Sequence, residues 1–302
     1  MKDDRRERER ERKKTAVKNL GMIVNLRKPE AVSMAGKLLQ WGKDNNCPFL
    51  LPHHEASALT TAGLDDEQWL KTVKLAIVIG GDGTFLRAAR YIMGTDIILH
   101  GINMGHLGFL ASSRPDDLEH DMANILNDNF EVLERRVLKC LLYHDDSVLH
   151  KIYALNDIVL TTNAIARLLH IEILFNFKFF CEMPADGAIV STATGSTAYA
   201  LSAGGPVIPP HMNAMILAPL CAHTLYSRPL IAAEDDCISL IPKGASRDIM
   251  LTQDGQLAYE VLPGDRIDIK LSRSKKIRTV NLPGRSFLDI VREKLGWGQA
   301  FR

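Results

Sequence analysis

Several features that would assign this sequence to a broad class of proteins are missing from it. Only five of its 302 residues are cysteine and none forms a C-x-x-C pair, so neither a disulfide framework nor a zinc site is indicated. No run of about 18 apolar residues occurs, which argues against a membrane-spanning helix. Lysine and arginine number 37 against 36 aspartate and glutamate residues, and this balance gives no electrostatic reason to expect nucleic acid or a membrane surface as the main partner.

The two common nucleotide-binding signatures are missing as well. The sequence contains neither G-x-x-x-x-G-K-[ST] nor G-x-G-x-x-G, which disfavours a P-loop or a Rossmann dinucleotide site. The first 14 residues include 13 charged ones and no apolar segment, unlike a secretory signal peptide. We expect residues 1–18 to form a charged flexible tail and the protein to be cytoplasmic.

The first part of the chain alternates apolar segments with helical patterns. Strand patterns cover residues 21–25, 48–51, 75–79 and 97–101, and helical patterns cover residues 29–39, 68–70, 84–93 and 115–126. The run at 75–79 is continuously apolar, which is typical of a strand buried on both faces of a parallel sheet. We therefore predict an open α/β domain over residues 19–130.

Beyond Phe130 the alternation stops and short strand patterns follow one another. They cover residues 139–143, 158–162, 170–174, 178–181, 188–191, 237–241, 248–252 and 266–271. This succession predicts an all-β domain over residues 131–280, stacked like a β-sandwich. Residues 286–295 have a helical pattern again, and we expect the segment 281–302 to pack back on the α/β domain.

A glycine-rich loop follows the buried strand pattern. Its sequence is Gly80-Gly81-Asp82-Gly83-Thr84, and a helical pattern begins within it. Glycines leave backbone amides uncovered and a helix N-terminus attracts anions, so the loop can hold a di- or triphosphate. A carboxylate beside phosphate favours phosphoryl transfer, either as a base or next to a metal ion. The alternative is a plain tight turn in which the aspartate caps the helix.

A second cluster is rich in hydroxyl groups. Six hydroxyl side chains lie between Ser191 and Tyr199, after the segment 184–187 and before Gly204-Gly205-Pro206. Small residues let a ligand approach the backbone, and hydroxyl groups can bind ribose, amide and phosphate groups. The alternative is a polar connector between strands. A serine-hydrolase role for Ser196 is disfavoured because no G-x-S-x-G surrounds it.

Other short motifs are weaker. Asn156-Asp157 can hold the two hydroxyls of a ribose, although such a pair is also common where a strand begins. The segments 103–110 and 253–256 are turn candidates. His53-His54-Glu55 lacks helical spacing and follows a proline, so we expect a solvated loop there and not a metal site.

Taken together, the motifs resemble those of the NAD kinase family. The resemblance extends from about residue 20 to residue 297 and includes the segments 80–84, 103–110, 156–157, 186–187, 194–206, 223–225, 228–229 and 254–256. Gly-Gly-Asp-Gly alone is shared with diacylglycerol kinases, sphingoid lipid kinases and phosphofructokinases, whereas Thr-Gly-Ser-Thr-Ala-Tyr followed by Ser-Ala-Gly-Gly-Pro is specific to NAD kinases. A lipid kinase of the same superfamily and a non-catalytic NAD(H)-binding sensor are the alternatives.

The resemblance implies an enzyme that uses ATP to phosphorylate the 2′-hydroxyl of the adenosine ribose of NAD, giving NADP, with a divalent metal, usually Mg²⁺. It implies Asp82 as the general base, no residue assigned to the metal, and a homo-oligomer, dimer or tetramer. Polyphosphate is an alternative donor in some relatives. The residues that the resemblance places against nucleotides are Gly80, Gly81, Asp82, Gly83, Thr84, Arg87, Asn103, Asn156, Asp157, Arg167, Asp186, Thr197, Ala198, Tyr199, Ser202 and Gln256.

Two positions depart from the family pattern. Many members carry arginine where this chain has Pro184, and many carry proline where it has Ala193. The choice between NAD and NADH is therefore open at the level of sequence.

Overall fold

The computed structural model describes residues 19–105, 107–111, 113–162, 168–224, 227–244, 248–284 and 286–296. Contacts between residues divide the chain into two compact units. Within the described residues, the first unit comprises 19–134 and 278–296, and the second comprises 135–277. None of the helices in these ranges is long and apolar enough to cross a membrane.

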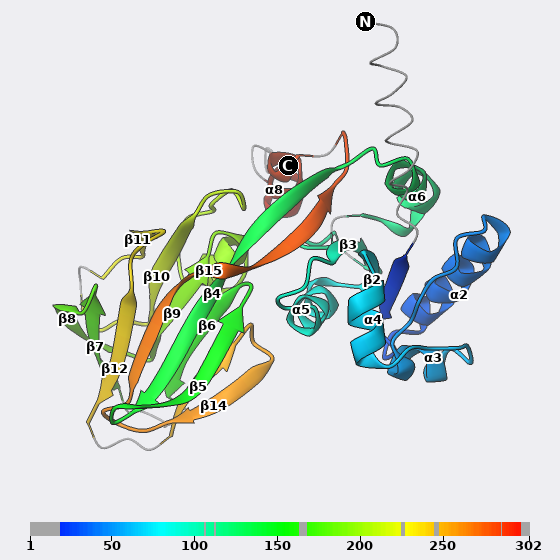
Figure 1. The fold of residues 1–302 in the computed structure, drawn as a ribbon. Helices are drawn as coiled ribbons and strands as arrows, with labels where there is room; N and C mark the ends of the chain where they lie inside the picture. The colour runs from blue at the N-terminus through cyan, green and yellow to red at the C-terminus, as the bar shows by residue number, and fades with distance from the viewer. Residues whose placement is uncertain are drawn as a thin grey trace, which may run out of the picture. The chain divides into compact units, whose positions relative to one another are not determined.

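The first unit is built on parallel strands (Figure 1). Strand β1 (Leu20–Val24) pairs with β2 (Leu75–Gly80), β2 pairs with β3 (Ile98–Asn103), and the end of β15 (Arg266–Asn281) pairs with β3. Every residue of β1 and β2 is buried, as expected for strands covered on both faces. The predicted α/β fold of this part of the chain is confirmed.

Helices accompany these strands in the first unit (Figure 1). They are α2 (Pro29–Asp44), α3 (His53–Ala58), α4 (Asp66–Thr72), α5 (Asp82–Tyr91), α6 (Leu118–Leu126), preceded by the 3₁₀ turn η1 (Pro115–Asp117), and α8 (Phe287–Leu295). Helix α2 begins with proline and packs Ala31, Ala35 and Leu38 into the same apolar core as β1 and β2. Helix α8 begins with a capping box between Ser286 and Asp289. It belongs to the first unit, as predicted for the C-terminal segment.

The second unit contains two sheets whose assigned registers are antiparallel. In one sheet β15, β12 (Ile238–Lys243), β7 (Leu169–Phe175) and β8 (Lys178–Ala185) follow in order, and β4 (Glu131–His144) pairs with β15 and with β5 (Ser147–Ala154). The other sheet has the order β11 (Leu230–Ala233), β10 (Ala214–Leu220), β9 (Gly187–Thr192), β6 (Asp157–Thr162), β13 (Ile249–Gln253) and β14 (Leu257–Val261).

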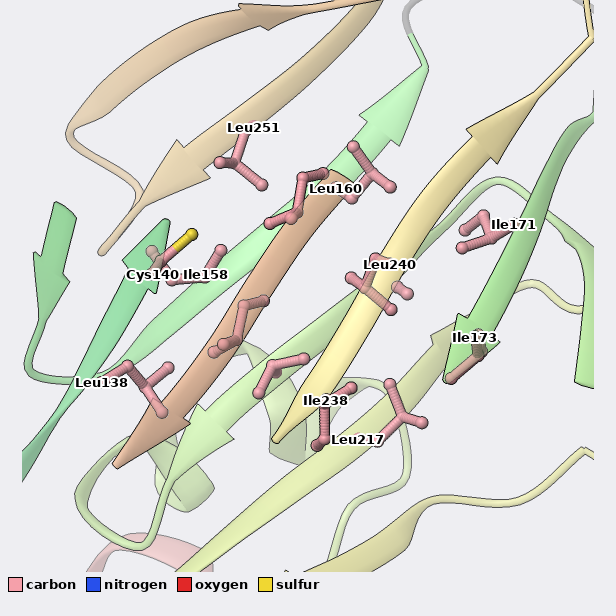
Figure 2. Packing of buried hydrophobic residues seen from close by; sticks show 14 of the residues in the cluster. Leu138, Cys140, Ile158, Leu160, Ile171, Ile173, Leu217, Ile238, Leu240 and Leu251 are labelled. Carbon is pink, nitrogen blue, oxygen red and sulfur yellow. The ribbon is translucent and has the colours of Figure 1, made fainter. Parts of the chain in front are cut away.

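One apolar core joins the two sheets of the second unit. Figure 2 shows Leu138 on β4 and Leu240 on β12 in the same cluster as Leu160 on β6 and Leu217 on β10. All four are buried. Side chains from both sheets therefore fill a common layer, which confirms the predicted sandwich-like stack.

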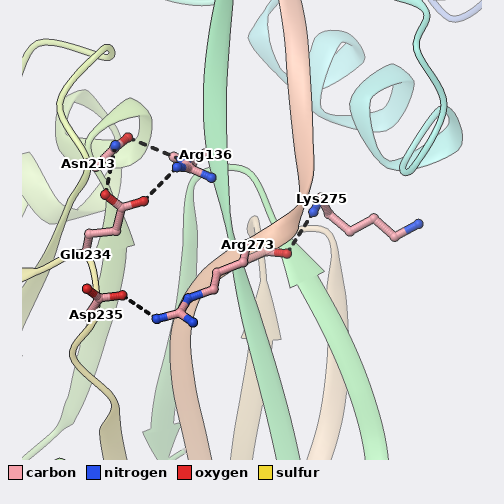
Figure 3. Close-up of polar contacts among 7 residues, drawn as sticks. Arg136, Asn213, Glu234, Asp235, Arg273 and Lys275 are labelled. Atoms are coloured by element: carbon pink, nitrogen blue, oxygen red, sulfur yellow. Dashed lines mark hydrogen bonds and ion pairs between the residues drawn. The ribbon is translucent and has the colours of Figure 1, made fainter.

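Polar contacts add to this core at the rim of the sheets (Figure 3). Arg136 on β4 donates to Glu234 at 2.6 Å, and Glu234 also accepts from Asn213 at 3.0 Å. Asn213 precedes β10 and Glu234 follows β11, so the contact connects the two sheets. Arg273 on β15 pairs with Asp235 at 2.7 Å, but both side chains are exposed and such pairs contribute little.

Two local predictions are wrong. Residues 48–51 do not form a strand; a single bridge joins Leu50 to Gly21. Prolines at positions 48 and 52 have no N–H to donate, and this prevents a longer ladder. The segment His53-His54-Glu55 is not a solvated loop but the first turn of α3. Strands β5, β10, β11 and β14 were not predicted at all.

The second error reflects an ion pair between the buried Glu55 and the half-exposed Arg87. The Glu55 carboxylate is only 3% exposed and accepts a hydrogen bond from Nη1 of Arg87 at 3.0 Å. Nη2 of Arg87 donates to the carbonyl oxygen of Val24 at 2.9 Å. The pair thus connects α3 with α5 and β1. Because Arg87 lies 32 residues away in sequence, the local pattern around Glu55 carries no sign of it.

This ion pair should contribute measurably to stability. Replacing Glu55 with glutamine removes the charge that Arg87 neutralises, and hydrogen bonds to charged groups are worth about 1.5 to 3 kcal/mol. We expect Glu55→Gln to lower the free energy of unfolding by about 1 to 3 kcal/mol in urea titrations. Glu67→Gln is the matched control, because Glu67 is 78% exposed and pairs with Lys71 on the surface; it should change stability by less than about 0.5 kcal/mol. Equal losses in the two variants would contradict the assignment.

Candidate functional site

The glycine-rich loop lies at the carboxyl end of β2 and opens α5. Gly81 is the N-cap of the helix and Asp82 is its first residue. A Cβ atom at Gly80 would lie 2.3 Å from the hydroxyl oxygen of Thr84, so only glycine allows the buried threonine to pack there. The loop therefore joins a parallel strand to the positive end of a helix, an arrangement that binds phosphate groups.

The Asp82 carboxylate does not cap the helix. Its Oδ2 accepts the N–H of Phe109 at 2.9 Å, and its Oδ1 accepts the N–H groups of Leu110 and Ala111 at 3.0 Å each. The capping alternative is therefore wrong. An ionised carboxylate offers about four acceptor positions, so these three bonds leave about one for a further donor.

The segment held by Asp82 follows β3. Asn103, buried at the end of that strand, and Gly108 both approach the aspartate: a Cβ atom at Gly108 would lie 2.1 Å from Oδ1 of Asp82 and 2.8 Å from Nδ2 of Asn103. Of the predicted turn at 103–110, His106 lies outside the described residues. The glycine-rich loop and the segment after β3 thus form one polar cluster within the first unit.

A second polar cluster lies at the start of β6 in the second unit. Asn156 precedes the strand, Asp157 begins it, and both are buried. The Asp254 carboxylate accepts three successive backbone N–H groups from this segment, those of Leu155 at 3.1 Å, Asn156 at 2.7 Å and Asp157 at 3.2 Å. On the other side, the carbonyl oxygen of Asn156 accepts the hydroxyl of Ser191 at 3.0 Å. The backbone at Asn156 is therefore held from both sides.

Two side chains of this cluster carry polar groups in unusual states. Oδ1 of Asn156 is buried and has no hydrogen-bond partner among the described residues, a situation that costs about 1 to 3 kcal/mol unless a donor reaches it. Desolvation, together with a smaller contribution from the nearby charge of Asp254, raises the pKa of Asp157 to about 7. At neutral pH the Asp157 carboxyl group is thus partly protonated and can donate as well as accept a hydrogen bond.

The hydroxyl-rich segment divides into buried and accessible groups. It forms the 3₁₀ turn η2 (Thr194–Thr197) and the short helix α7 (Tyr199–Ser202). Ser191, Thr192, Thr194 and Ser196 are buried, and Ser196 exchanges hydrogen bonds with the backbone of Ile208. Tyr199 and Ser202 are exposed and Thr197 is half-buried. The buried hydroxyls therefore fit the connector interpretation, and the binding interpretation stays a prediction for Thr197, Tyr199 and Ser202.

The remaining predicted site residues are distributed as follows. Arg87 is engaged with Glu55 in the first unit. In the second unit, Asp186 is exposed between β8 and β9, Ala198 is half-buried between η2 and α7, and Gln256 is exposed next to the β13–β14 turn. Arg167 lies outside the described residues.

Sequence reasoning missed the parts played by Gly108 and by the Asp254 carboxylate. The Asp-Gly pair at 254–255 was sufficiently explained by a hairpin, and the partners of its carboxylate lie 97 to 99 residues earlier in the chain. The sequence shows only an Asp-Gly pair in a predicted turn, and the burial of Asp254, which points to a further role, is visible only in the structure.

Comparisons of the whole chain with known proteins give a consistent result. Residues 20–130 match the model of the ATP-NAD kinase N-terminal domain, and residues 155–282 match that of the ATP-NAD kinase C-terminal domain. The chain is 36% identical over 284 residues to the NAD kinase of Moorella thermoacetica, covering 93% of this chain and 90% of that protein. It is 32% identical over 285 residues to the NAD kinase of Syntrophotalea carbinolica, covering 94% and 100%.

Solved structures show the same fold. The yeast NADH kinase complexed with NADH has a TM-score of 0.85 at 23% identity, covering 95% of this chain and 90% of that one. An NAD kinase from Archaeoglobus fulgidus in complex with ATP has a TM-score of 0.70 at 22% identity, covering 92% and 97%. Because both domain models and the full-length relatives agree, the chain belongs to the ATP-NAD kinase family.

Proposed function

We propose that this NAD kinase transfers the terminal phosphoryl group of ATP to the 2′-hydroxyl of the adenosine ribose of NAD, giving NADP, and that Asp82 is the general base. The observation that carries the role of Asp82 is its carboxylate, half-buried at the end of β2 with about one acceptor position left after three backbone bonds. A ribose hydroxyl can occupy that position, and a base within hydrogen-bond reach is what its weak nucleophilicity requires.

In the proposed reaction, ATP, the ribose hydroxyl and Asp82 account for every bond formed and broken and for the proton. The 2′-oxygen forms a bond to the terminal phosphorus of ATP, the bond from that phosphorus to the departing ADP oxygen breaks, and the hydroxyl proton passes to Asp82. The backbone at Gly80, Gly81, Gly83 and Thr84 is proposed to hold phosphate groups at the N-terminus of α5. Arg87 and Asn103, from α5 and the end of β3, are proposed as further nucleotide contacts.

In the second unit we propose that Asn156 and Asp157 bind NAD. Oδ1 of Asn156 would accept from a ligand donor and so satisfy its buried oxygen. Asp157, whose pKa is raised to about 7, would donate to or accept from a hydroxyl according to its protonation state. The further contacts proposed with NAD are Arg167, Asp186, Thr197, Ala198, Tyr199, Ser202 and Gln256.

We propose that Mg²⁺ enters as part of the ATP substrate. Among the described residues, no three His, Cys, Asp or Glu side chains gather into a group that could hold a metal ion. Mg²⁺ is usually bound through substrate phosphates, water and one or two carboxylates, and rarely by a dedicated protein cage. No step above depends on a metal ion held by the protein alone. The cytoplasmic location stays a prediction.

The general-base assignment predicts a large loss of turnover in Asp82→Asn. A positioned base contributes about 10²- to 10⁴-fold in rate. We therefore expect kcat to decrease by a factor in that range, measured in assays with NAD or NADH and ATP or polyphosphate. The amide nitrogen of asparagine would face backbone N–H donors, and we also expect a loss of about 1 to 3 kcal/mol in stability.

Asp96→Asn is the control for Asp82→Asn, since Asp96 is an exposed aspartate of the same unit. Its kcat and stability should stay near those of the parent. A kcat for Asp82→Asn within about threefold of the parent would refute the base role, because it falls far short of the expected effect.

The raised pKa of Asp157 predicts a pH dependence of stability. The folded protein binds this proton more tightly than the unfolded chain, whose pKa is near 3.8, so the stabilisation is complete below about pH 4 and is lost as the pH rises through about 7. Asp157→Asn should remove this slope, which amounts to on the order of 4 kcal/mol at 1.36 kcal/mol per pKa unit. Urea titrations from pH 4 to pH 8 measure it. Asp235→Asn, at an aspartate 77% exposed, should retain the slope; retention in Asp157→Asn would contradict the assignment.

We further propose that the enzyme is a homo-oligomer. In support, the hairpin of β7 and β8 exposes Phe177, Phe179 and Phe180 by 65%, 67% and 54%, and such an apolar group on an edge strand is typical of protein contacts. Sedimentation velocity at assay concentrations should show a dimer or tetramer. A fully active monomer under those conditions would count against the proposal.

A further inference from the structure

Asp254 occupies a turn that does not require a carboxylate. It follows β13, and the N–H of Gln256 donates to the carbonyl oxygen of Gln253 at 2.9 Å to close the turn. The two central residues, Asp254 and Gly255, have φ angles of 49° and 61°, as in a type I′ turn. Asparagine and glycine suit such a position at least as well as aspartate. The turn therefore explains the backbone at this position but not the charge.

The carboxylate is instead engaged with the segment that begins β6. Its two oxygens accept all three N–H groups of residues 155–157. In return, the N–H of Asp254 donates to the carbonyl oxygen of Asp157 at 3.0 Å. Four hydrogen bonds thus join the turn to the segment that carries Asn156. Only a carboxylate supplies acceptors at both oxygens for three donors.

The opposite side of this segment is also closed. The hydroxyl of Thr192 donates to the carbonyl oxygen of Leu155 at 2.6 Å, and the N–H of Thr192 donates to the carbonyl oxygen of Asn156 at 2.8 Å. A Cβ atom at Gly195 would lie only 2.3 Å from the backbone carbonyl oxygen of Asn156. With its backbone fixed on both sides, Asn156 keeps a buried side-chain oxygen that no described residue satisfies.

We propose that Asp254 is a positioning residue for NAD: by binding the backbone of residues 155–157 it holds the side chains of Asn156 and Asp157 in the orientation that receives the dinucleotide. This inference rests on the proposed binding role of those two residues. Asp254 itself does not need to contact the substrate.

The charge of Asp254 gives the proposal a second consequence. It adds to the rise in the pKa of Asp157 that desolvation causes. The residues that face this region on the adjacent strands, Ser191 on β9 and Gln253 on β13, are uncharged. Removing the charge of Asp254 should therefore move the titration of Asp157 to lower pH.

The test compares Asp254→Asn and Asp254→Gly with the parent, using the full chain. Both substitutions suit the positive φ, but asparagine offers one acceptor oxygen and glycine none. Asp265→Asn is the matched control, because Asp265 is also buried in a turn of the second unit and accepts the N–H of Leu262 at 2.8 Å. The measurements are kcat, the KM for NAD and for ATP from pH 5.5 to 8.5, and amide hydrogen exchange of residues 155–157.

We expect Asp254→Asn to raise the KM for NAD by about 10- to 100-fold, the scale set by losing hydrogen bonds to a charged acceptor. The KM for ATP should stay within about twofold, and kcat should change less than the KM for NAD. Asp254→Gly should raise the KM for NAD further. Exchange at residues 155–157 should become faster in both variants. The pH inflection in the KM for NAD should move to lower pH in Asp254→Asn and stay in place in Asp265→Asn.

A KM for NAD in Asp254→Asn within about twofold of the parent would overturn the proposal, and so would equal effects in Asp265→Asn and Asp254→Asn. A variant that loses stability without the split between the two KM values would assign Asp254 a purely structural part. Failure of the proposed function is distinguishable, because it would show as a parent that does not phosphorylate NAD. In that case faster exchange at residues 155–157 without any change in NAD binding, measured by calorimetry, would refute the positioning role.

Discussion

Three successive backbone N–H groups converge on one carboxylate in each unit of this protein, and the arrangement of the polar site residues depends on these two contacts. In the first unit Asp82 gathers the N–H groups of residues 109–111; in the second, Asp254 gathers those of residues 155–157. Hydrogen bonds to an ionised acceptor are shorter and stronger than neutral ones. A single side chain can therefore fix three consecutive backbone N–H groups of a segment that lies far from it in the chain.

The two carboxylates differ in what they leave available. Asp82 sits at the end of a strand and the start of a helix, an arrangement that suits phosphate binding, and about one acceptor position of its carboxylate is left beside its three backbone bonds. Asp254 is buried in a hairpin turn, and the groups it leaves for a ligand belong to its neighbours Asn156 and Asp157. The same interaction thus accompanies a proposed reactive group in one unit and a proposed positioning group in the other.

Close approach of backbone to side chain explains the small residues around both contacts. Gly108 lies against Asp82, and Gly195 lies against the carbonyl oxygen of Asn156, at distances where a Cβ atom could not be accommodated. The hydroxyls of Ser191 and Thr192 complete the second contact. Glycine and short hydroxyl residues are needed here for packing and hydrogen bonding, in addition to any part they play with a nucleotide.

By itself the sequence determined the fold class, because the continuous apolar run of β2 and the later short strands carry periodicities that survive without tertiary context. It also determined the family and the position of Asp82 between a strand and a helix, since these depend on residues close together in the chain. Only the tertiary structure decided the partners of Glu55, Asp82 and Asp254, which lie tens of residues away. The physical reason is that a carboxylate is satisfied by whichever donors the fold brings to it, and local sequence carries no record of donors that arrive from another strand or loop.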